Sequence, residues 1–225
     1  MLIELDGVRV LTDPVLRGRV GHLRRVASTG AVPKNVDAVL VSHAHRDHLD
    51  VPSLTRLGRD QRIVVPEGAG RALRRRGFRQ VGEVAAGDEV RVAAVGVRAT
   101  WANHGAHALG YVVGGSRLVY FAGDTDVFAE MAYLAPGLDL ALLPVWGWGR
   151  RVGPGHMDPR RAVRALQLLR PRVAVPIHWG TLAPLWWRTA SRSSAEPALA
   201  FERHAREMAP SVDVRVLAPG GSTAF

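Results

Sequence analysis

Three histidines and two aspartates crowd into nine residues directly after a short apolar run. Residues 42–50 read Ser-His-Ala-His-Arg-Asp-His-Leu-Asp. In an extended loop, residues i and i+2 lie on the same side, so His43 and His45 can converge on one ion while Asp47 and His48 turn toward a second. Imidazole and carboxylate groups suit zinc and similar divalent ions. A solvated polar loop is the alternative, and packing alone explains the cluster poorly.

The chain has no cysteine, so any metal must be held by histidine, aspartate or glutamate. Disulfide frameworks, iron–sulfur clusters and thiol nucleophiles are excluded for the same reason. Three further ligand candidates each follow a predicted strand, and they are His104, Asp124 and His178. His107 is an alternative to His104, which lies nearer the end of its strand. Taken singly, each is compatible with an ordinary loop or core residue, but together they indicate a shared site.

Short apolar runs predict strands throughout the first half and alternating strands and helices in the second half. Strands are predicted over 2–5, 8–11, 38–41, 62–65, 90–100, 109–113, 117–121, 138–144, 172–177 and 212–217, and helices over 159–169 and 197–208. A Gly-Gly-Ser sequence at 114–116 predicts a hairpin turn. Asp158 can cap the first helix, and Pro159 suits its first position. The longest predicted loop covers 181–197.

Composition places the chain among globular proteins, because 47% of its residues are hydrophobic and 22% are charged. Its length predicts one domain over residues 1–225. No stretch approaches the ~20 uninterrupted apolar residues of a membrane helix. The start lacks the basic flank and long apolar run of a signal peptide, so we expect a cytoplasmic protein.

The formal net charge of +10 raises the question of nucleic-acid binding. The excess is nearly all arginine, with Lys34 the only lysine, and it is scattered along the chain. The densest group is Arg71, Arg74, Arg75 and Arg76, on a short predicted helix. Such a run is usually a solvated face, so charge alone does not predict a nucleic-acid partner.

The chain contains the pattern His-x-His-x-Asp-His, followed by a separate His, Asp and His, across residues 43–178. This pattern resembles the sequence motif of the metallo-β-lactamase fold hydrolases. Three further segments narrow the resemblance: Gly-Asp-Thr at 123–125, His-Met-Asp-Pro at 156–159 and Ile-His-Trp-Gly-Thr at 177–181. They look like the branch that contains N-acylphosphatidylethanolamine phospholipase D and L-ascorbate-6-phosphate lactonase. The last two segments are more selective than the superfamily pattern.

The resemblance implies an α/β fold, an αββα sandwich of two facing β-sheets flanked by helices, with metals at the shared edge of strand ends. It implies two divalent ions, zinc by default, with manganese or iron as alternatives. It places one ion on His43, His45 and His104, the other on Asp47, His48 and His178, and Asp124 on both. A bridging hydroxide would be the nucleophile, since coordination lowers the pKa of water from ~15.7 to ~7.

Further residues are expected around this edge. By resemblance, His156 lies at the open face, where it binds a substrate oxyanion or protonates a leaving group, with helix capping as the alternative. Arg150 or Arg151 would help to neutralise developing charge. Asp50 is expected to orient a ligand histidine, and Asp126 to cap the next helix. The histidines expected to be structural or exposed are His22 and His204.

Tryptophans gather in the same part of the sequence. Those near the expected site are Trp146, Trp148, Trp179, Trp186 and Trp187. Glycines flank Trp148, which favours a loop that presents rings to a cleft, with core packing as the alternative. An apolar-walled pocket would favour a substrate with an acyl or aromatic part.

These observations predict a dinuclear metal-dependent hydrolase that cleaves a phosphodiester or an ester or lactone bond of a small or lipid-like substrate. The alternative is a metal-dependent nuclease, although the superfamily's nucleases carry extra arms or domains for which 225 residues leave no room. Di-iron oxygen or nitric-oxide reduction is disfavoured, because it needs Glu in place of His45 and a flavin partner domain. Metal binding without turnover is disfavoured by the complete ligand set. Two departures from the family, a short 105–109 segment and little chain before Leu2, remove no ligand.

Overall fold

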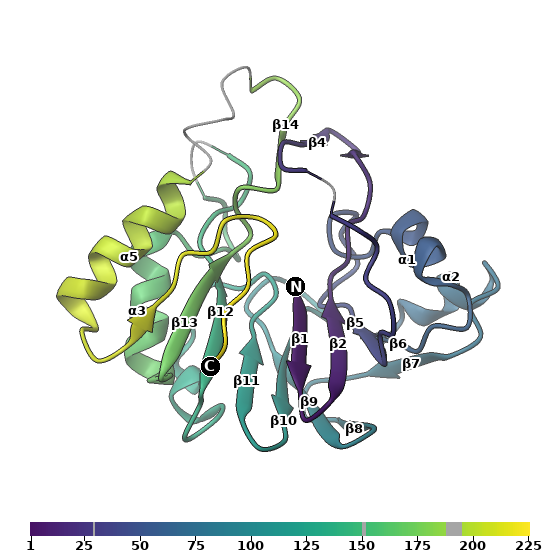
Figure 1. The fold of residues 1–225 in the computed structure, drawn as a ribbon, viewed down its shortest axis with the longest axis horizontal. Coiled ribbons are helices and arrows are strands. Elements are labelled where there is room, and N and C mark those ends of the chain that lie inside the picture. The colour runs from purple at the N-terminus through teal and green to yellow at the C-terminus, as the bar shows by residue number, and fades with distance from the viewer. Residues whose placement is uncertain (29, 150–151, 188–194) are drawn as a thin grey trace.

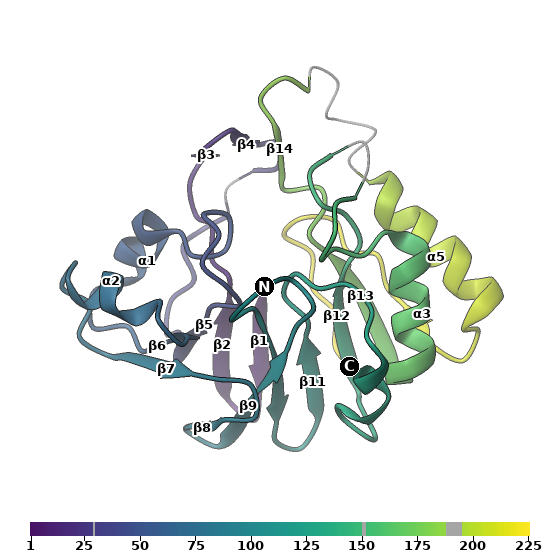
Figure 2. The same ribbon diagram turned by 180° about the vertical axis from the view of Figure 1, so that it is seen from behind.

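Two β-sheets face each other, and helices cover the outer face of each sheet (Figure 1, Figure 2). The structure is a computed structural model that describes residues 1–28, 30–149, 152–187 and 195–225. The arrangement is the predicted αββα sandwich.

Within the described residues, one sheet has five strands in the order β1-β2-β5-β6-β7. The strands are β1 (Leu2–Leu5), β2 (Val8–Thr12), β5 (Ala38–Leu40), β6 (Ile63–Pro66) and β7 (Val81–Val84). Strand β1 is antiparallel to β2, and the other neighbours are parallel. Two short helices, α1 (Val51–Leu57) and α2 (Gly70–Arg74), cover the outer face. Strands buried on both faces read as continuous apolar runs, which explains why the sequence predicts β5 and β6.

The second sheet contains seven strands of the described chain, in the order β15-β13-β12-β11-β10-β9-β8. They are β8 (Glu89–Val92), β9 (Val95–Trp101), β10 (Leu109–Gly114), β11 (Leu118–Phe121), β12 (Leu140–Pro144), β13 (Val173–Ile177) and β15 (Asp213–Val214). Strands β8 to β11 form antiparallel hairpins, and β11, β12, β13 and β15 are parallel. The outer face packs against α3 (Pro159–Leu169), α5 (Glu196–Met208) and the 3₁₀ turn η1 (Ala129–Tyr133).

A small third sheet lies beside the upper edge of the sandwich in Figure 1. It joins β3 (Arg19–Val20), β4 (Leu23–Arg25) and β14 (Leu182–Pro184) in the order β14-β4-β3. The pairing of β4 with β14 brings a segment of the first half of the chain against one of the second half.

The main core fills the space between the two large sheets. Alternate residues of β5 divide between two layers: Ala38 and Leu40 join the core between the sheets, and Val39 joins the layer under α1 and α2. Apolar burial of this kind is the main stabilising contribution to the fold. The buried Tyr111 hydroxyl on β10 donates a 2.8 Å hydrogen bond to the carbonyl of Val41, so a polar contact also ties the two sheets together.

Helix α3 begins and ends where its sequence predicts. The carboxylate of Asp158 accepts a 2.9 Å hydrogen bond from the backbone N–H of Arg161, and Pro159 occupies the first helical position. Arg170 ends the helix in a left-handed conformation. This firm start fixes the preceding loop, which carries His156.

Three predictions of secondary structure are wrong in detail. Residues 90–100 form two strands of a hairpin, because Ala93 turns the chain with φ 48° and the apolar pattern runs through the turn. The strand predicted over 212–217 is only Asp213–Val214, where the chain pairs with β13. The loop predicted over 181–197 contains β14 and the first residues of α5, and its residues 188–194 lie outside the described part of the chain. No helix among the described residues is long and apolar enough to cross a membrane.

Candidate metal centre

The candidate ligands meet at one edge of the sandwich because each follows the carboxyl end of a strand. His43, His45, Asp47 and His48 lie between β5 and α1, His104 follows β9, Asp124 follows β11 and His178 follows β13. The parallel pairing of β2 with β5, and of β11 with β12 and β13, points these ends the same way. The structure therefore brings together all seven residues that the sequence predicts as metal ligands.

A first group consists of His43, His45 and His104. The Nε2 atom of His43 lies 2.9 Å from Nδ1 of His45, and the Nε2 atom of His104 lies 3.3 Å from the same Nδ1. Three ring nitrogens this close can bind one divalent ion. His107 is an exposed residue with φ 65° and belongs to no such group in the described chain, so the structure favours His104 over the alternative.

A second group consists of Asp47, His48 and His178. The Oδ2 atom of Asp47 lies 3.7 Å from Nε2 of His48 and 3.9 Å from Nε2 of His178. The two histidine rings are nearly parallel, with centroids 5.3 Å apart. This group combines one carboxylate with two imidazoles and can also bind a divalent ion.

The carboxylate of Asp124 faces both groups. Its Oδ1 atom lies 3.3 Å from Nε2 of His178, and its Oδ2 atom lies 3.2 Å from Nε2 of His48 and 3.9 Å from Nε2 of His43. Gly123, directly before it, has φ 60°, and a Cβ atom there would lie 2.6 Å from the Cβ of Ser42. Only glycine fits this turn, so the local sequence Gly-Asp is what delivers the carboxylate to the centre.

Three ligand atoms of the centre are buried without a hydrogen-bond partner among the described residues. They are Nε2 of His48, Nε2 of His178 and Oδ1 of Asp124. Buried polar atoms in proteins are nearly always paired, and an unpaired one costs about 1–3 kcal/mol. Two imidazole nitrogens and a carboxylate oxygen are suitable ligands for zinc and related ions, so the residues present fit a bound metal.

The opposite ring nitrogens are held by the surrounding protein. Nδ1 of His104 lies 2.7 Å from the carbonyl of Gly155, and Nδ1 of His178 lies 2.6 Å from the carbonyl of Trp146. A carbonyl only accepts, so Nδ1 carries the proton in both rings and Nε2 is left with a free lone pair. Such contacts orient metal-binding imidazoles and raise their basicity.

Asp13 is a functional residue that was not predicted from the sequence. It follows β2, and its Oδ2 atom lies 2.6 Å from Nδ1 of His48 and accepts a 2.6 Å hydrogen bond from the hydroxyl of Ser42. Its signal was available, because Asp13 lies two residues after the strand predicted over 8–11, near a strand end like the other candidates. The orienting role predicted for Asp50 is wrong: Asp50 caps α1 and pairs with Arg17 at 2.6 Å.

Other expectations have mixed outcomes. Asp126 does not cap η1, whose cap is Phe128; its carboxylate instead pairs with Arg161 at 3.0 Å. His22 is exposed and stacks on Trp186, and His204 lies half-buried on α5, so both are outside the centre as expected. Arg150 and Arg151 lie outside the described residues.

Burial and charge shift the acid–base equilibria of the centre in opposite directions. Burial alone would lower the pKa of His48, but the carboxylates of Asp124 and Asp13 outweigh it and raise that pKa well above its usual value. Burial would raise the pKa of Asp124, but His178 and His48 hold it well below its usual range. Burial, with the charge of His48, lowers the pKa of His43 to about 3. His43 is therefore a neutral ring with a free lone pair at neutral pH, as a metal ligand must be.

His156 lies beside the centre and is half-buried. Its Nε2 atom is 3.4 Å from Oδ2 of Asp124, and its ring is 4.5 Å from that of His104. Hydrogen bonding to Asp124 raises the pKa of His156 despite its partial burial, which by itself would lower it. The capping alternative is not supported, because Asp158 caps α3.

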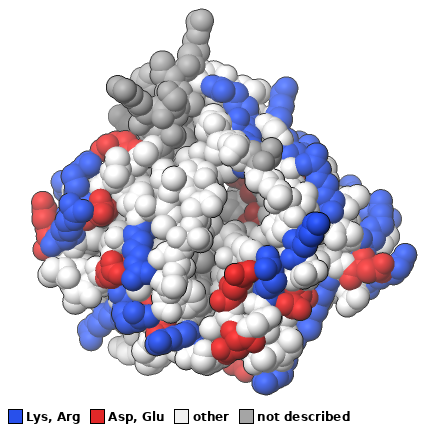
Figure 3. Space-filling model, viewed as in Figure 1, with Lys and Arg blue, Asp and Glu red and all other residues white. Residues whose placement is uncertain are grey.

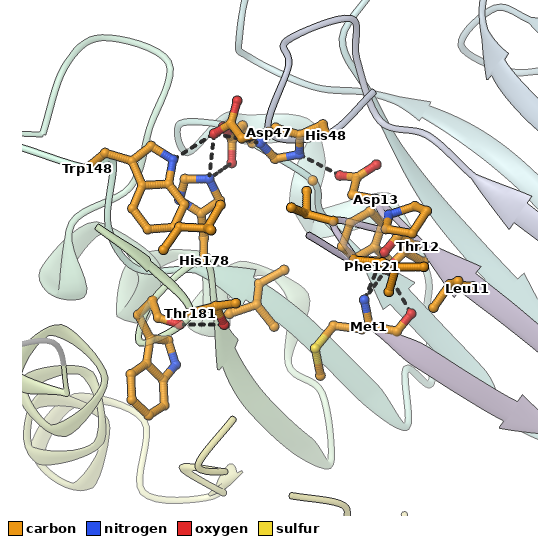
Figure 4. A pocket seen from close by; sticks show the side chains of 18 of the residues that line it. Met1, Leu11, Thr12, Asp13, Asp47, His48, Phe121, Trp148, His178 and Thr181 are labelled. Carbon is orange, nitrogen blue, oxygen red and sulfur yellow. Dashed lines mark hydrogen bonds and ion pairs between the residues drawn. The ribbon is translucent and has the colours of Figure 1, made fainter. Parts of the chain in front are cut away.

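Aromatic side chains surround the second group (Figure 4). The indole Nε1 of Trp148 donates a 2.7 Å hydrogen bond to Oδ2 of Asp47. Trp146 packs edge-on against Trp148 and against Trp187. The loop thus presents the ring of Trp148 to the site, as the first interpretation predicts. The ring of Trp146 is buried, as the core-packing alternative predicts.

Comparison with known proteins agrees with this geometry. The model of a beta-lactamase superfamily domain matches residues 8–179. A UPF0173 metal-dependent hydrolase from Methanopyrus kandleri is 31% identical over 98% of this chain and 94% of its own length. A protein from Mycobacterium tuberculosis is 34% identical over 83% of this chain, but the match spans only 58% of that longer protein.

A solved structure with the same fold is Igni18, a metallo hydrolase from Ignicoccus hospitalis. The two structures superpose with a TM-score of 0.73 and 27% sequence identity, covering 99% of this chain and 92% of Igni18. The domain match, the relative from Methanopyrus kandleri and the likeness to Igni18 agree. The chain belongs to the beta-lactamase superfamily and, within it, to the UPF0173 family of metal-dependent hydrolases.

Proposed function

We propose that this metal-dependent hydrolase is dinuclear, with one ion on His43, His45 and His104 and the other on Asp47, His48 and His178. Asp124 would bind both ions. The observation that carries the proposal is the trio of buried, unpaired ligand atoms on His48, His178 and Asp124 within the described chain. The contacts of both Asp124 oxygens with the histidines of the two groups support the bridging role.

When bound, two such ions would supply a bridging hydroxide at neutral pH and polarise the bond that is cleaved. The chain's own residues do the rest. Asp13 holds the ring of His48, Trp148 holds the carboxylate of Asp47, and backbone carbonyls hold His104 and His178. His156, which is half-buried and has a raised pKa, can give a proton to a leaving group or bind the negative charge that develops on the substrate.

The proposed substrate is a small molecule with a phosphodiester, carboxylic ester or lactone bond. Hydrolysis of all three needs a nucleophile, an electrophilic centre and a group that stabilises negative charge. The segments His-Met-Asp-Pro at 156–159 and Ile-His-Trp-Gly-Thr at 177–181 support a relationship to the phospholipase D and lactonase branch. Zinc is the proposed metal, with manganese or iron as alternatives.

Nuclease activity is the weaker candidate. The densest arginine group lies exposed on α2, which packs on the outer face of the five-stranded sheet. The cavity beside the second ligand group is walled mainly by apolar side chains. The only Lys or Arg in its described lining is Arg25, whose guanidinium donates to backbone carbonyls, whereas a groove for a phosphate backbone carries several basic side chains. A gel-shift assay with short RNA and DNA duplexes at low salt is the test, and a steeply salt-dependent shift would support a nuclease.

The experiment that tests the proposal is a side-by-side turnover assay of zinc-loaded protein. One substrate is a generic phosphodiester and the other a hydrophobic lactone, with bound zinc counted on the same samples. Asp124→Ala should lose turnover and bind fewer ions. The matched control is Asp60→Ala, because Asp60 is an exposed aspartate whose carboxylate pairs with the exposed Arg79. Full activity of Asp124→Ala would contradict the bridging role.

We further propose that residues 1–225 act as one catalytic unit. Each candidate ligand group combines residues that follow strands of both large sheets. The strands that precede these residues contribute side chains to the core between the sheets and to the cores under the outer helices. Limited proteolysis of zinc-loaded protein should leave the catalytic activity and the large sheets together in one fragment.

A further inference from the structure

A cavity of about 250 Å³ opens beside the second ligand group. Figure 3 shows a hollow near the middle of this face, with acidic side-chain atoms visible inside it. Four candidate ligands line the cavity: Asp47, His48 and His178, which are labelled in Figure 4, and Asp124. The cavity therefore leads directly to the place where a bond would be cleaved.

The walls of the cavity are mostly apolar. They include Leu11 from β2, Phe121 from β11 and Ile177 from β13, with exposed fractions of 5%, 3% and 9%. Trp179 and Leu182 continue the apolar lining. Besides the candidate ligands, two charged residues, Asp13 and Arg25, line the cavity, but both are paired within the protein: the Asp13 carboxylate with His48, and the Arg25 guanidinium with backbone carbonyls of the loop at 15–17. The remaining, apolar walls gain free energy when a hydrocarbon group replaces water.

The outer wall is a loop, residues 14–17, that the protein holds firmly. The backbone N–H of Leu16 donates a 2.7 Å hydrogen bond to the hydroxyl of Ser53, and the guanidinium of Arg17 pairs with Asp50 at 2.6 Å. Arg25 donates to the carbonyls of Val15 and Arg17. Because this loop is tied to α1 and to β4, the cavity is a preformed feature and not a gap behind a loose segment.

The size of the cavity limits what enters it. Pockets that bury drug-sized ligands are about 300–1,000 Å³, so a cavity of about 250 Å³ suits a short chain or a single ring. The long acyl chains of a membrane phospholipid do not fit inside it. The cavity therefore limits the length of the substrate group that it can enclose.

The position of His156 decides which side of the cleaved bond enters the cavity. His156 is not among the residues that line it. Its ring lies 4.5 Å from that of His104, which does not line the cavity either, and 6.3 Å from that of His178, which does, so His156 lies toward the His104 side of the centre. A leaving group protonated by His156 would lie on that side. The part of the substrate that keeps the electrophilic carbon is then directed into the cavity.

We propose that the cavity is the acyl site of a carboxylic ester hydrolase and takes a short, uncharged aliphatic or aromatic acyl group. This inference rests on the proposed function. Water adds to the carbonyl carbon, the bond from that carbon to the alcohol oxygen breaks, and the alcohol leaves with a proton. The products are the carboxylate, the alcohol and one proton, so no oxidant or other co-reactant is needed.

The test is the acyl-length profile of zinc-loaded protein on p-nitrophenyl esters of acetate, butanoate, hexanoate and decanoate. Val15 lines the cavity from the loop and is half-buried, so Val15→Phe fills the space without changing the core. Val15→Phe should lower kcat/KM for the hexanoyl ester about tenfold or more and change the acetyl ester by less than about twofold. Val15→Ala should improve the decanoyl ester relative to the hexanoyl ester. Val32→Phe, at an exposed loop position outside the cavity, should change neither.

A binding measurement separates failure of the cavity from failure of the catalytic proposal. Hexanol is a neutral probe that needs no metal, and tryptophan fluorescence should report its binding through Trp148 and Trp179, which line the cavity. Hexanol should bind wild type and the control Val32→Phe equally and should bind Val15→Phe about tenfold more weakly. If hexanol binds as expected and no ester is cleaved, the ester chemistry is wrong and the apolar site stands. An unchanged acyl profile together with unchanged hexanol binding in folded Val15→Phe overturns the proposal.

Discussion

The indole Nε1 of Trp148 donates to Oδ2 of Asp47 at 2.7 Å, while its ring packs 4.4 Å from that of His178. Trp148 has φ 60°, a conformation that is rare for a bulky residue and costs on the order of 1–3 kcal/mol. The flanking glycines, Gly147 and Gly149, let the loop approach this conformation. One side chain thus positions two candidate ligands of the same group, and this explains why the strained backbone persists.

Trp148→Phe should weaken binding of the second metal ion about tenfold, because it keeps an aromatic ring beside His178 but removes the hydrogen bond to Asp47. Competition with a chromogenic chelator would measure the affinities of both ions. Trp186→Phe is the matched control, since Trp186 is exposed and stacks on His22. Identical zinc affinities for Trp148→Phe and wild type would remove the positioning role.

Asp13→Asn should lower zinc affinity about 10-fold to 100-fold, because a neutral amide replaces the carboxylate that holds His48. Asparagine tolerates the positive φ of 41° at this position, so the backbone can remain in place. Asp6→Asn is a close control: Asp6 has φ 51° and accepts hydrogen bonds from Ser116, far from the centre in the sequence and fold. Native mass spectrometry would count the ions, and equal occupancy in all three proteins would contradict the expected role of Asp13.

The metal-free protein should lose stability as the pH falls from about 6 to about 4.5. His43 stays neutral in the fold because its pKa is about 3, whereas in the unfolded chain it takes up a proton near pH 6.5. Burial lowers the pKa values of His104 and His178 as well, so all three favour the unfolded chain at acid pH. His48, whose pKa is raised, is protonated in both states in this window and adds no slope.

Urea unfolding at several pH values would measure this dependence. His43→Gln should reduce the slope of unfolding free energy against pH, because it removes one of the three groups. His22→Gln is the matched control, because it removes an exposed histidine outside the centre. A stability that rises toward pH 4.5 would contradict the expected sign of this dependence.

Gly123→Ala should destabilise the protein by about 2 kcal/mol or more. The new Cβ atom would lie 2.6 Å from the Cβ of Ser42 and 2.9 Å from the carbonyl of Leu109, in a conformation with φ 60°. Gly137→Ala separates the effect of the close contacts from the effect of the positive φ, because Gly137 has φ 78° but open space around it. The thermal midpoint should therefore fall further for Gly123→Ala, and equal falls would assign the whole effect to backbone conformation.

The sequence predicts candidate ligands best where the ligands lie close together in the chain or directly after a recognisable strand. The run from His43 to His48 predicts ligands by spacing alone, and Asp124 and His178 are recognisable because each follows an apolar strand. Asp13 obeys the same rule but stands alone, so only the three-dimensional pairing with His48 reveals its role. Asp50 illustrates the reverse case. It lies in the motif, yet its carboxylate caps α1 at Ser53 and pairs with Arg17, which is distant in the sequence.

The predicted strand boundaries were wrong where the apolar pattern of a strand continues through a turn. Ala93 and Ala94 continue the alternation between β8 and β9, although Ala93 reverses the chain. The third sheet was not predicted either, because β3, β4 and β14 are two or three residues long and exist through pairing between distant segments. Their stability comes from tertiary contacts, which a local pattern does not encode.

Each candidate ligand group draws on both large sheets: His43 and His45 follow β5, whereas His104 follows β9. A bound ion would therefore link two stretches of chain, residues 1–84 and 89–225, which are joined by the exposed turn at 85–88. A protein nicked at that turn would keep its two fragments together while zinc is present, and a chelator would loosen them. The same chain could thus serve as a split reporter whose reassembly reads out the supply of free metal.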